Sequence, residues 1–194
     1  MSSRAAFDVL FITRSMTQRW NGVSEAEIHL LGYLSCLLSV LEGSPGSLWG
    51  YSFAATASAT PFSLELNATI DQLLGAGLLE DVSGLFGETQ RGRRELAIWT
   101  SLGRMSGTRS RYLDAACAST SSLTPPLVLE ALRKDPQLET YREQAARPLL
   151  DESGVAMVQA HFQALKQVVG TWSTPLVPAV VWLSSLPASP RLVD

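Results

Sequence analysis

Apolar residues recur at helical spacing along much of the chain, beginning near its N-terminus. Leu10 and Phe11 lie three and four residues after Phe7, which predicts an amphipathic helix over residues 4–19. The Asn21-Gly22 pair then breaks this pattern. The first predicted element is therefore a helix with one face for the core.

The second predicted helix, over residues 24–41, has the best-defined start in the sequence. Ser24 can cap the first turn and Glu27 can reach back to the cap, which is the capping-box pattern. Val23, just before the cap, can pack against Ile28 as a hydrophobic staple. Because this helix is apolar on most sides, we expect it to form the centre of the core.

A third helix is predicted after a turn-rich connector, residues 42–60. Thr60-Pro61 supplies a cap followed by proline in the first turn, where the missing N–H costs nothing. The helix should end at Gly75 or Gly77, because glycine tolerates the left-handed conformation beyond a helix end. Its inward residues are expected to be Phe62, Leu66, Ile70, Leu73 and Leu74.

A β-hairpin is predicted to follow the third helix. Residues 78–82 form a short strand, Ser83-Gly84 is a candidate turn, and the alternation in residues 95–100 predicts the second strand. Residues 86–94 would then form a polar, basic hairpin tip. The arginines at the tip and after the second strand are Arg91, Arg93, Arg94 and Arg104.

The order of three helices, strand, basic loop and strand is typical of a winged helix. The fold class predicted is therefore mainly α (α+β), with a winged-helix-like domain over residues 1–124 and a helical extension over residues 125–194. Pro125-Pro126, after a Ser/Thr-rich stretch, marks the boundary. A small α+β domain of another topology remains the alternative.

Composition indicates a folded protein in a reducing compartment. Hydrophobic residues make up 46% of the chain and charged residues 17%. Cys36 and Cys117 lie far apart without CxxC spacing, which favours buried thiols and leaves a disulfide between them open. The N-terminus lacks a signal-peptide pattern and no run is long enough to span a membrane, so we expect a cytoplasmic protein.

The charge distribution argues against a third helix that reads DNA. The net charge is -3, so any DNA contact must come from a local patch. Residues 61–81 contain no Lys or Arg, although a major-groove helix needs cations for phosphates. The acidic residues there are Glu65, Asp71, Glu80 and Asp81. Asn67 is more plausible as part of a solvated polar face than as a base reader.

Two sets of residues are candidates for binding. Arg91, Arg93, Arg94 and Arg104 could contact a DNA backbone, meet an acidic partner, or simply keep the loop solvated. A protein partner is expected to contact exposed aromatic residues of the connector together with the acidic third helix. These residues are Trp49, Tyr51, Phe53, Glu65 and Asp71.

No catalytic, metal or cofactor pattern is present in the sequence. Neither lysine lies in a phosphate-binding GxxxxGK[ST] run, and no GxSxG occurs. His29 and His161 belong to no HExxH or Cys/His cluster; His29, four residues after Glu25, is expected to be partly buried or in a surface pair. We therefore expect a protein that is not an enzyme and that needs no cofactor or metal.

The first hundred residues resemble the small middle components of bacterial ABC-three-component systems, including the accessory subunit of Lamassu-type anti-phage defence. The resemblance rests on "FDVLFITRSM", "AEIHLLGYLSCLL", "WGYSFAAT" and "PFSLELNATIDQLLGAGLLE". The longer, proline-interrupted C-terminal half departs from that pattern. The resemblance implies a non-catalytic subunit that joins an SMC-like or ABC-type ATPase to an effector such as a nuclease.

Three functional hypotheses follow. The first is an adaptor in an SMC-like, DNA-sensing anti-phage complex, with DNA contacted indirectly or weakly through the wing. The second is a winged-helix transcription regulator that binds DNA through its arginine-rich wing. A small-molecule-sensing domain is the third, and no pocket signature in the sequence supports it.

Overall fold

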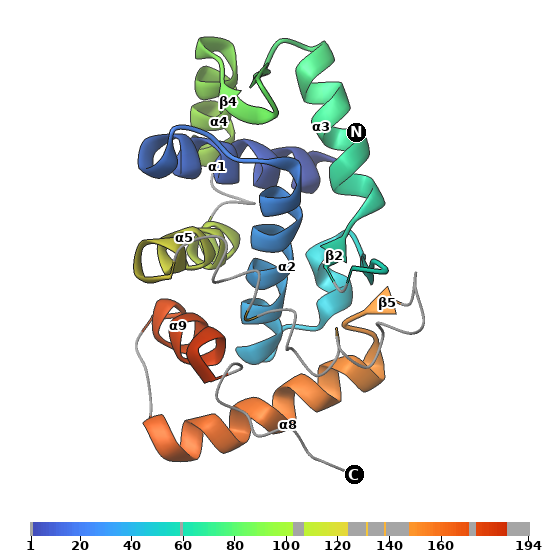
Figure 1. Cartoon of the computed structure of the whole chain (residues 1–194), viewed down its shortest axis with the longest axis vertical. Helices are drawn as coiled ribbons and strands as arrows, with labels where there is room; N and C mark the ends of the chain where they lie inside the picture. Colours follow the sequence, from blue (N-terminus) through green and yellow to red (C-terminus); the bar gives the residue numbers. More distant parts are fainter. Residues whose placement is uncertain are drawn as a thin grey trace.

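The computed structural model is mainly helical, with a few short antiparallel strands, as the sequence predicts (Figure 1). It describes residues 2–58, 60–102, 107–123, 131, 138, 148–170 and 174–185. None of the helices in these ranges is both long and apolar enough to cross a membrane.

The first two helices begin and end close to where the sequence predicts. α1 spans Ser3–Trp20 and is followed by Asn21, whose φ of 63° is left-handed. α2 spans Glu25–Leu41. The Ser24 N–H donates to Glu27 Oε2 (2.7 Å) and the Glu27 N–H donates to Ser24 Oγ (3.4 Å). The predicted capping box is thus confirmed.

The second helix forms the centre of the molecule, which also confirms a prediction. α2 is buried without interruption from Ile28 to Val40. It packs most extensively on α5 (Gly107–Ser122), and α8 (Glu152–Val169) lies across its far end (Figure 1). α9 (Leu176–Ser185) packs on α5 and also contacts α2.

A small three-stranded antiparallel sheet lies beside α2. Its strands, in the order β2-β1-β5, are Pro61–Phe62, Phe53–Ala55 and Pro148–Leu149. Ala54 of the central strand pairs with Phe62 on one side and Pro148 on the other. A short 3-10 helix, η1 (Gly46–Trp49), precedes the sheet. The predicted turn-rich connector is therefore a structured part of the core.

α3 spans Leu64–Gly75 and begins later than predicted. The prediction that Thr60-Pro61 caps it is wrong, because the proline and Phe62 form β2 and Ser63 is the cap. The Phe62 ring lies 4.6 Å from the His29 ring, centroid to centroid. Strand pairing and this packing outweigh the preference of proline for a first helical turn.

The helix stop and the turn after α3 are confirmed. Gly77, two residues beyond the end of α3, has a φ of 66°. β3 (Leu79–Val82) and β4 (Leu85–Glu88) then form a hairpin. Ser83 and Gly84 between them have φ values of 58° and 84°, as a tight hairpin turn with two left-handed residues requires.

The predicted second strand over residues 95–100 is wrong, because this segment belongs to α4 (Gln90–Ser101). Thr89 caps the helix by accepting a hydrogen bond from the Gly92 N–H at 3.0 Å. Gly92 and Leu96, four residues apart, are its buried residues. The apparent alternation was one face of a helix, and β4 begins ten residues earlier.

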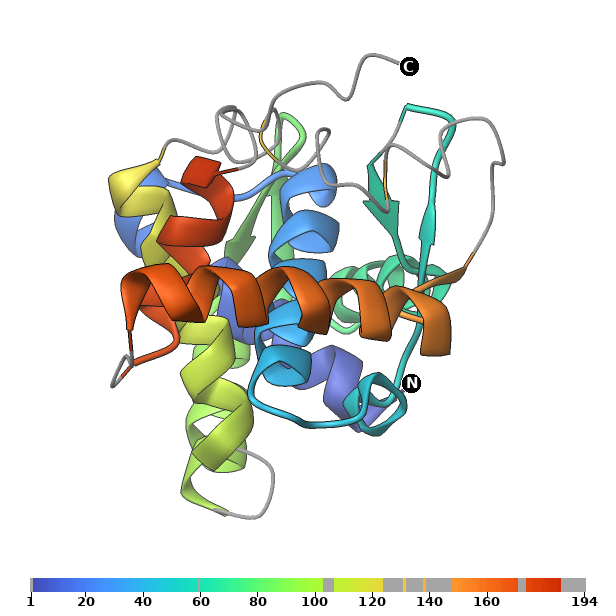
Figure 2. The ribbon, with the colours of Figure 1, turned by 90° about the horizontal axis from the view of Figure 1, so that it is seen from below.

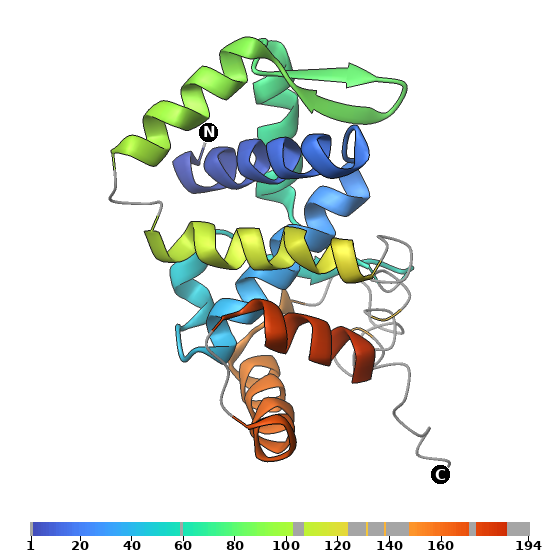
Figure 3. The same cartoon turned by 90° about the vertical axis from the view of Figure 1, so that its left-hand side faces the viewer.

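One backbone bridge ties the hairpin to the first two helices. Val23, between α1 and α2, pairs antiparallel with Phe86 of β4 through hydrogen bonds of 3.1 and 2.8 Å. The hairpin and α4 therefore lie against α1 at one end of the molecule (Figure 3).

The last described elements pack on the first part of the chain. β5 pairs with β1, α8 contacts α2 and α9 contacts α5 (Figure 2). The predicted boundary between residues 1–124 and 125–194 falls outside the described residues.

Gly92 should tolerate no side chain, because a Cβ atom there would overlap the backbone carbonyl of Leu78. We expect Gly92→Ala to lower the free energy of unfolding by about 1–3 kcal/mol, as overpacking usually does. Gly75→Ala is the matched control, since nothing lies within 4 Å of a Cβ atom there. It should be neutral or stabilising by up to about 1 kcal/mol. Urea denaturation of both variants tests this; equal stabilities would contradict it.

Candidate interaction surface

A buried ion pair anchors the region next to α3. Asp8 of α1 is fully buried and receives three hydrogen bonds from side chains. Arg109 of α5 donates from Nε to Oδ1 at 2.5 Å and from Nη2 to Oδ2 at 2.6 Å. The Tyr51 hydroxyl donates to Oδ2 at 2.6 Å. This arrangement satisfies the carboxylate and joins three segments that are distant in sequence.

Burial and charge act in opposite directions on this cluster. Complete burial raises the pKa of Asp8, although the hydrogen bonds and charge of Arg109 oppose that rise. Burial also acts to lower the pKa of Arg109, but the hydrogen bond and charge of Asp8 outweigh it and the pKa rises. Burial, with the Asp8 charge, raises the pKa of Tyr51 well above its ordinary value, so its hydroxyl remains a donor.

The aromatic residues of the connector surround this pair instead of facing solvent. The prediction that Trp49, Tyr51 and Phe53 are exposed is wrong, because their side chains are 4%, 8% and 3% exposed. The Arg109 guanidinium lies 3.8 Å above the centre of the Trp49 ring and donates to the Trp49 carbonyl at 2.8 Å. The ion pair thus holds Trp49 by stacking and Tyr51 by a hydrogen bond, and Phe53 packs on the Tyr51 ring with centroids 5.4 Å apart.

Removing the Asp8 carboxylate should leave the Arg109 charge buried without its partner, which destabilises the fold. We expect Asp8→Asn to lower the free energy of unfolding by about 3–5 kcal/mol, because it leaves the buried Arg109 charge uncompensated. Asp114→Asn is the matched control, since this exposed carboxylate lies 3.9 Å from Arg19. It should cost at most about 1 kcal/mol. Denaturant titration measures both, and a cost below about 1 kcal/mol for Asp8→Asn would contradict the assignment.

The outward face of α3 is acidic and partly apolar. Glu65 and Asp71, both predicted to contact a partner, are exposed. Leu64 at the start of the helix is 72% exposed. The other exposed side chains of this face are Ala68 and Gln72. α3 contains no Lys or Arg, and Asn67 is half-buried.

The predicted arginine cluster lies at the start of α4, so the prediction that it forms a hairpin tip is wrong. Arg91 donates from Nη1 to the Ala76 carbonyl at 2.9 Å, next to the end of α3. Arg93 pairs with the buried carboxylate of Glu88 at 3.0 Å. Arg94 is exposed, and Arg104 lies outside the described residues. Two of the four arginines therefore have intramolecular roles.

His29 connects α2 to the start of α3. It is 3% exposed, and its Nδ1 accepts a hydrogen bond from the Ser63 N–H at 3.2 Å. The proton of the neutral ring must then be on Nε2, which lies 3.7 Å from Glu25 Oε1. Burial lowers the pKa of His29 to about 4. The sequence predicts a partly buried or paired histidine, but offers no sign of its contact with Ser63.

Stability should therefore decrease in mild acid. The pKa of His29 rises from about 4 in the folded chain to about 6.5 on unfolding, so the unfolded state binds the extra proton. The stabilisation is complete above pH 6.5 and is lost as the pH falls towards 4, by about 3 kcal/mol. His29→Asn keeps an acceptor without titrating in this range. The free energy of unfolding, measured from pH 7 to 4, should fall by about 3 kcal/mol more for the wild type than for His29→Asn. The same pH dependence in both proteins would refute the assignment.

Neither cysteine is placed for chemistry at neutral pH. Cys36 and Cys117 are free and buried, which confirms the prediction of buried thiols. Burial raises the pKa of each thiol to about 12, so both stay protonated. In the described part of the chain, no group of three His, Cys, Asp or Glu side chains is arranged to hold a metal ion.

Comparisons of the chain with protein-family models, with curated proteins and with solved structures found no match.

Proposed function

We propose that this protein is a non-catalytic adaptor that uses the outward face of α3 to dock onto another protein. One observation carries this proposal: the exposed side chains of α3 include Leu64, Glu65 and Asp71 and no cation. An exposed leucine beside carboxylates suits a protein partner, whereas a polyanion would be repelled.

The order of elements supports a winged-helix-like arrangement for this region. α1, the Val23 bridge, α2, α3 and the β3-β4 hairpin follow one another as they do in a winged helix. In such proteins the third helix is the one that enters the major groove. Residues 42–63 between α2 and α3 are longer than the tight turn of a helix-turn-helix, and contain η1, β1 and β2.

The contacts of the arginines also favour docking on a protein over DNA binding. Arg91 and Arg93 already contact Ala76 and Glu88 within the chain. These contacts hold both guanidinium groups against the chain's own surface, and the Glu88 carboxylate offsets the charge of Arg93. Among the described residues of the predicted cluster this leaves Arg94, and a single arginine offers little of the electrostatic gain on which DNA binding depends.

The sequence resemblance suggests the identity of the partners. The adaptor would join an SMC-like or ABC-type ATPase to an effector such as a nuclease, in an anti-phage complex. In that setting the ATPase contacts the DNA, and this subunit contributes protein contacts. The alternative is a transcription regulator, and the observation that favours it is Arg94, which is exposed on α4 and could contact a DNA backbone.

Affinity purification from native cells tests the adaptor function. We expect a tagged chain to recover an ATPase of this class, and Asp71→Arg to reduce recovery at least about tenfold through charge repulsion. Asp114→Arg is the matched control, because Asp114 is exposed on α5, away from α3. Quantitative mass spectrometry gives the readout. Equal recovery with all three proteins would reject α3 as the docking face.

Titration with duplex DNA separates the adaptor from the regulator. The purified chain should bind duplexes only weakly and without sequence preference, since the face of α3 repels phosphate. Arg94→Glu should leave partner recovery unchanged. Sequence-selective binding by the chain, abolished by Arg94→Glu, would establish the regulator instead.

A further inference from the structure

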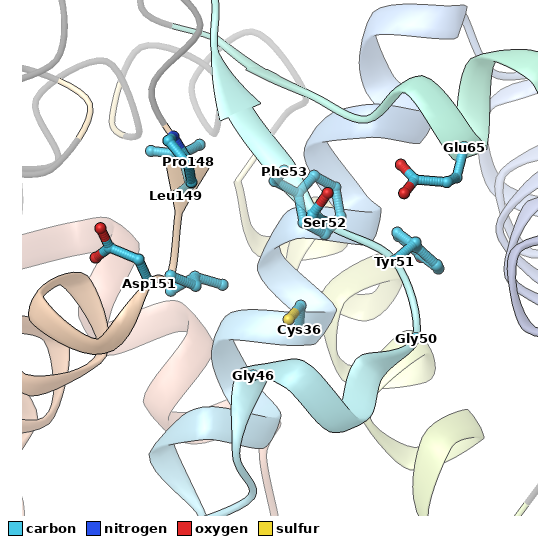
Figure 4. A pocket seen from close by; sticks show the side chains of 11 residues that line it. Cys36, Gly46, Gly50, Tyr51, Ser52, Phe53, Glu65, Pro148, Leu149 and Asp151 are labelled. Carbon is cyan, nitrogen blue, oxygen red and sulfur yellow. The ribbon is translucent and has the colours of Figure 1, made fainter.

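A hollow of about 470 Å³ lies between the connector and the start of α8 (Figure 4). Its described lining comes from four parts of the chain: the connector (Gly46 and residues 50–53), Cys36 of α2, Glu65 of α3 and residues 148–151. Its volume is within the range of small-molecule sites. No pattern in the sequence indicates it, because its walls meet only in the folded chain.

The walls of the hollow are largely apolar. Phe53 and Leu149 contribute buried side chains from paired strands, and Leu150 adds a half-buried one. Gly46 and Gly50 also line it, and Gly50 lies against the Arg4 side chain, since a Cβ atom there would be 2.6 Å from Arg4 Cδ. An aliphatic group would therefore be well accommodated.

The two charged side chains of the described lining are both acidic. Glu65 and Asp151 line the hollow, whereas the described lining contains no Lys, Arg or His. Burial keeps Cys36 and Tyr51 neutral by raising their pKa values. A cation would be attracted here and an anion repelled.

The two carboxylates differ in the hydrogen bonds that they accept within the chain. Asp151 Oδ1 accepts hydrogen bonds from the Gly154 N–H and the Ser153 hydroxyl, both at 2.8 Å, and so caps α8. Glu65 Oε2 accepts from the Ser63 hydroxyl at 3.2 Å. In Figure 4 the Glu65 carboxylate points towards Ser52 and Phe53, across the hollow from Asp151. Glu65 is thus the group positioned to receive a ligand.

We propose that this hollow binds an organic cation, with an ammonium or guanidinium group at Glu65 and an aliphatic stem against Phe53 and Leu149. An anion would meet two negative charges. A neutral apolar ligand would desolvate Glu65 without compensation. The described residues supply too few donors for a metal ion.

Such a cation has two sources: a free alkylamine or alkylguanidine, or a lysine or arginine side chain of another protein. The site does not depend on the docking function, because a free amine could fill it without any partner. If a partner supplies the cation, Glu65 belongs to both the hollow and the α3 face.

Calorimetric titration with butylguanidinium tests the site directly. Binding to the wild-type chain should be one-to-one, and Glu65→Gln should weaken it at least about tenfold through loss of a charge-assisted contact. Asp114→Asn is the matched control, because it removes the same charge from an exposed position of α5 outside the hollow. Equal weakening in both variants, or equally tight binding of the neutral analogue butylurea, would overturn the proposal.

A second variant guards against loss of structure in the first. Ser52→Trp, at an exposed position of the wall, should abolish binding by filling the hollow while Glu65 is retained. Thermal melts of both variants should match wild type. Retained binding in Ser52→Trp would place the cation elsewhere and overturn the proposal.

Competition between probes identifies the source. A blocked Gly-Arg-Gly peptide that binds more tightly than butylguanidinium would support a partner side chain, and one that binds more weakly would support a free amine. Failure of both probes to bind would refute the site, whatever the purification experiment shows about docking. Conversely, if butylguanidinium binds but no ATPase is recovered, the cation site is supported and the docking function is rejected.

Discussion

The architecture depends on the burial of one carboxylate. Asp8 lies in the buried part of α1, where an unpaired charge would be strongly destabilising. Its partners Arg109 and Tyr51 come from α5 and from the connector, so satisfaction of one charge fixes three segments at once. Apolar packing alone tolerates small shifts of one helix along another. The bidentate contact between Arg109 and Asp8 does not tolerate such shifts, so it fixes the position of α5 on α1.

The same pair explains why the connector is folded inward. Trp49 stacks on Arg109, and Arg4 donates to the Leu48 carbonyl at 2.7 Å, so two arginines hold the end of η1. The connector then returns to α3 through the β1-β2 pair. α3 is held on its inner side by α1 and by the contact between His29 and Ser63. Its outer face is therefore left without a covering element among the described residues.

Local patterns predicted the local structure well and the long-range contacts poorly. The capping box at Ser24 and the left-handed turn at Ser83-Gly84 depend on neighbouring residues, so the sequence reveals them. The sequence predicts a strand over residues 95–100, because a short apolar alternation fits the two-residue period of a strand as well as the 3.6-residue period of a helix. In the structure the segment is helical, and Thr89 caps the helix. Asp8 and Arg109 are 101 positions apart, so no spacing rule connects them. Without that link, the connector aromatics were expected on the surface, and the hollow beside them was not foreseen.

The pairing of β5 with β1 has a consequence for the order of events during synthesis. β1 is synthesised almost a hundred residues before Pro148, so the edge of β1 that pairs with β5 has no partner strand while the intervening chain is translated. Only when Pro148 and Leu149 arrive is the three-stranded sheet complete and one wall of the hollow in place. A nascent chain can thus acquire its first two helices early and its binding cavity only near the end. Occupancy of that cavity would report that the last third of the polypeptide has closed onto the first.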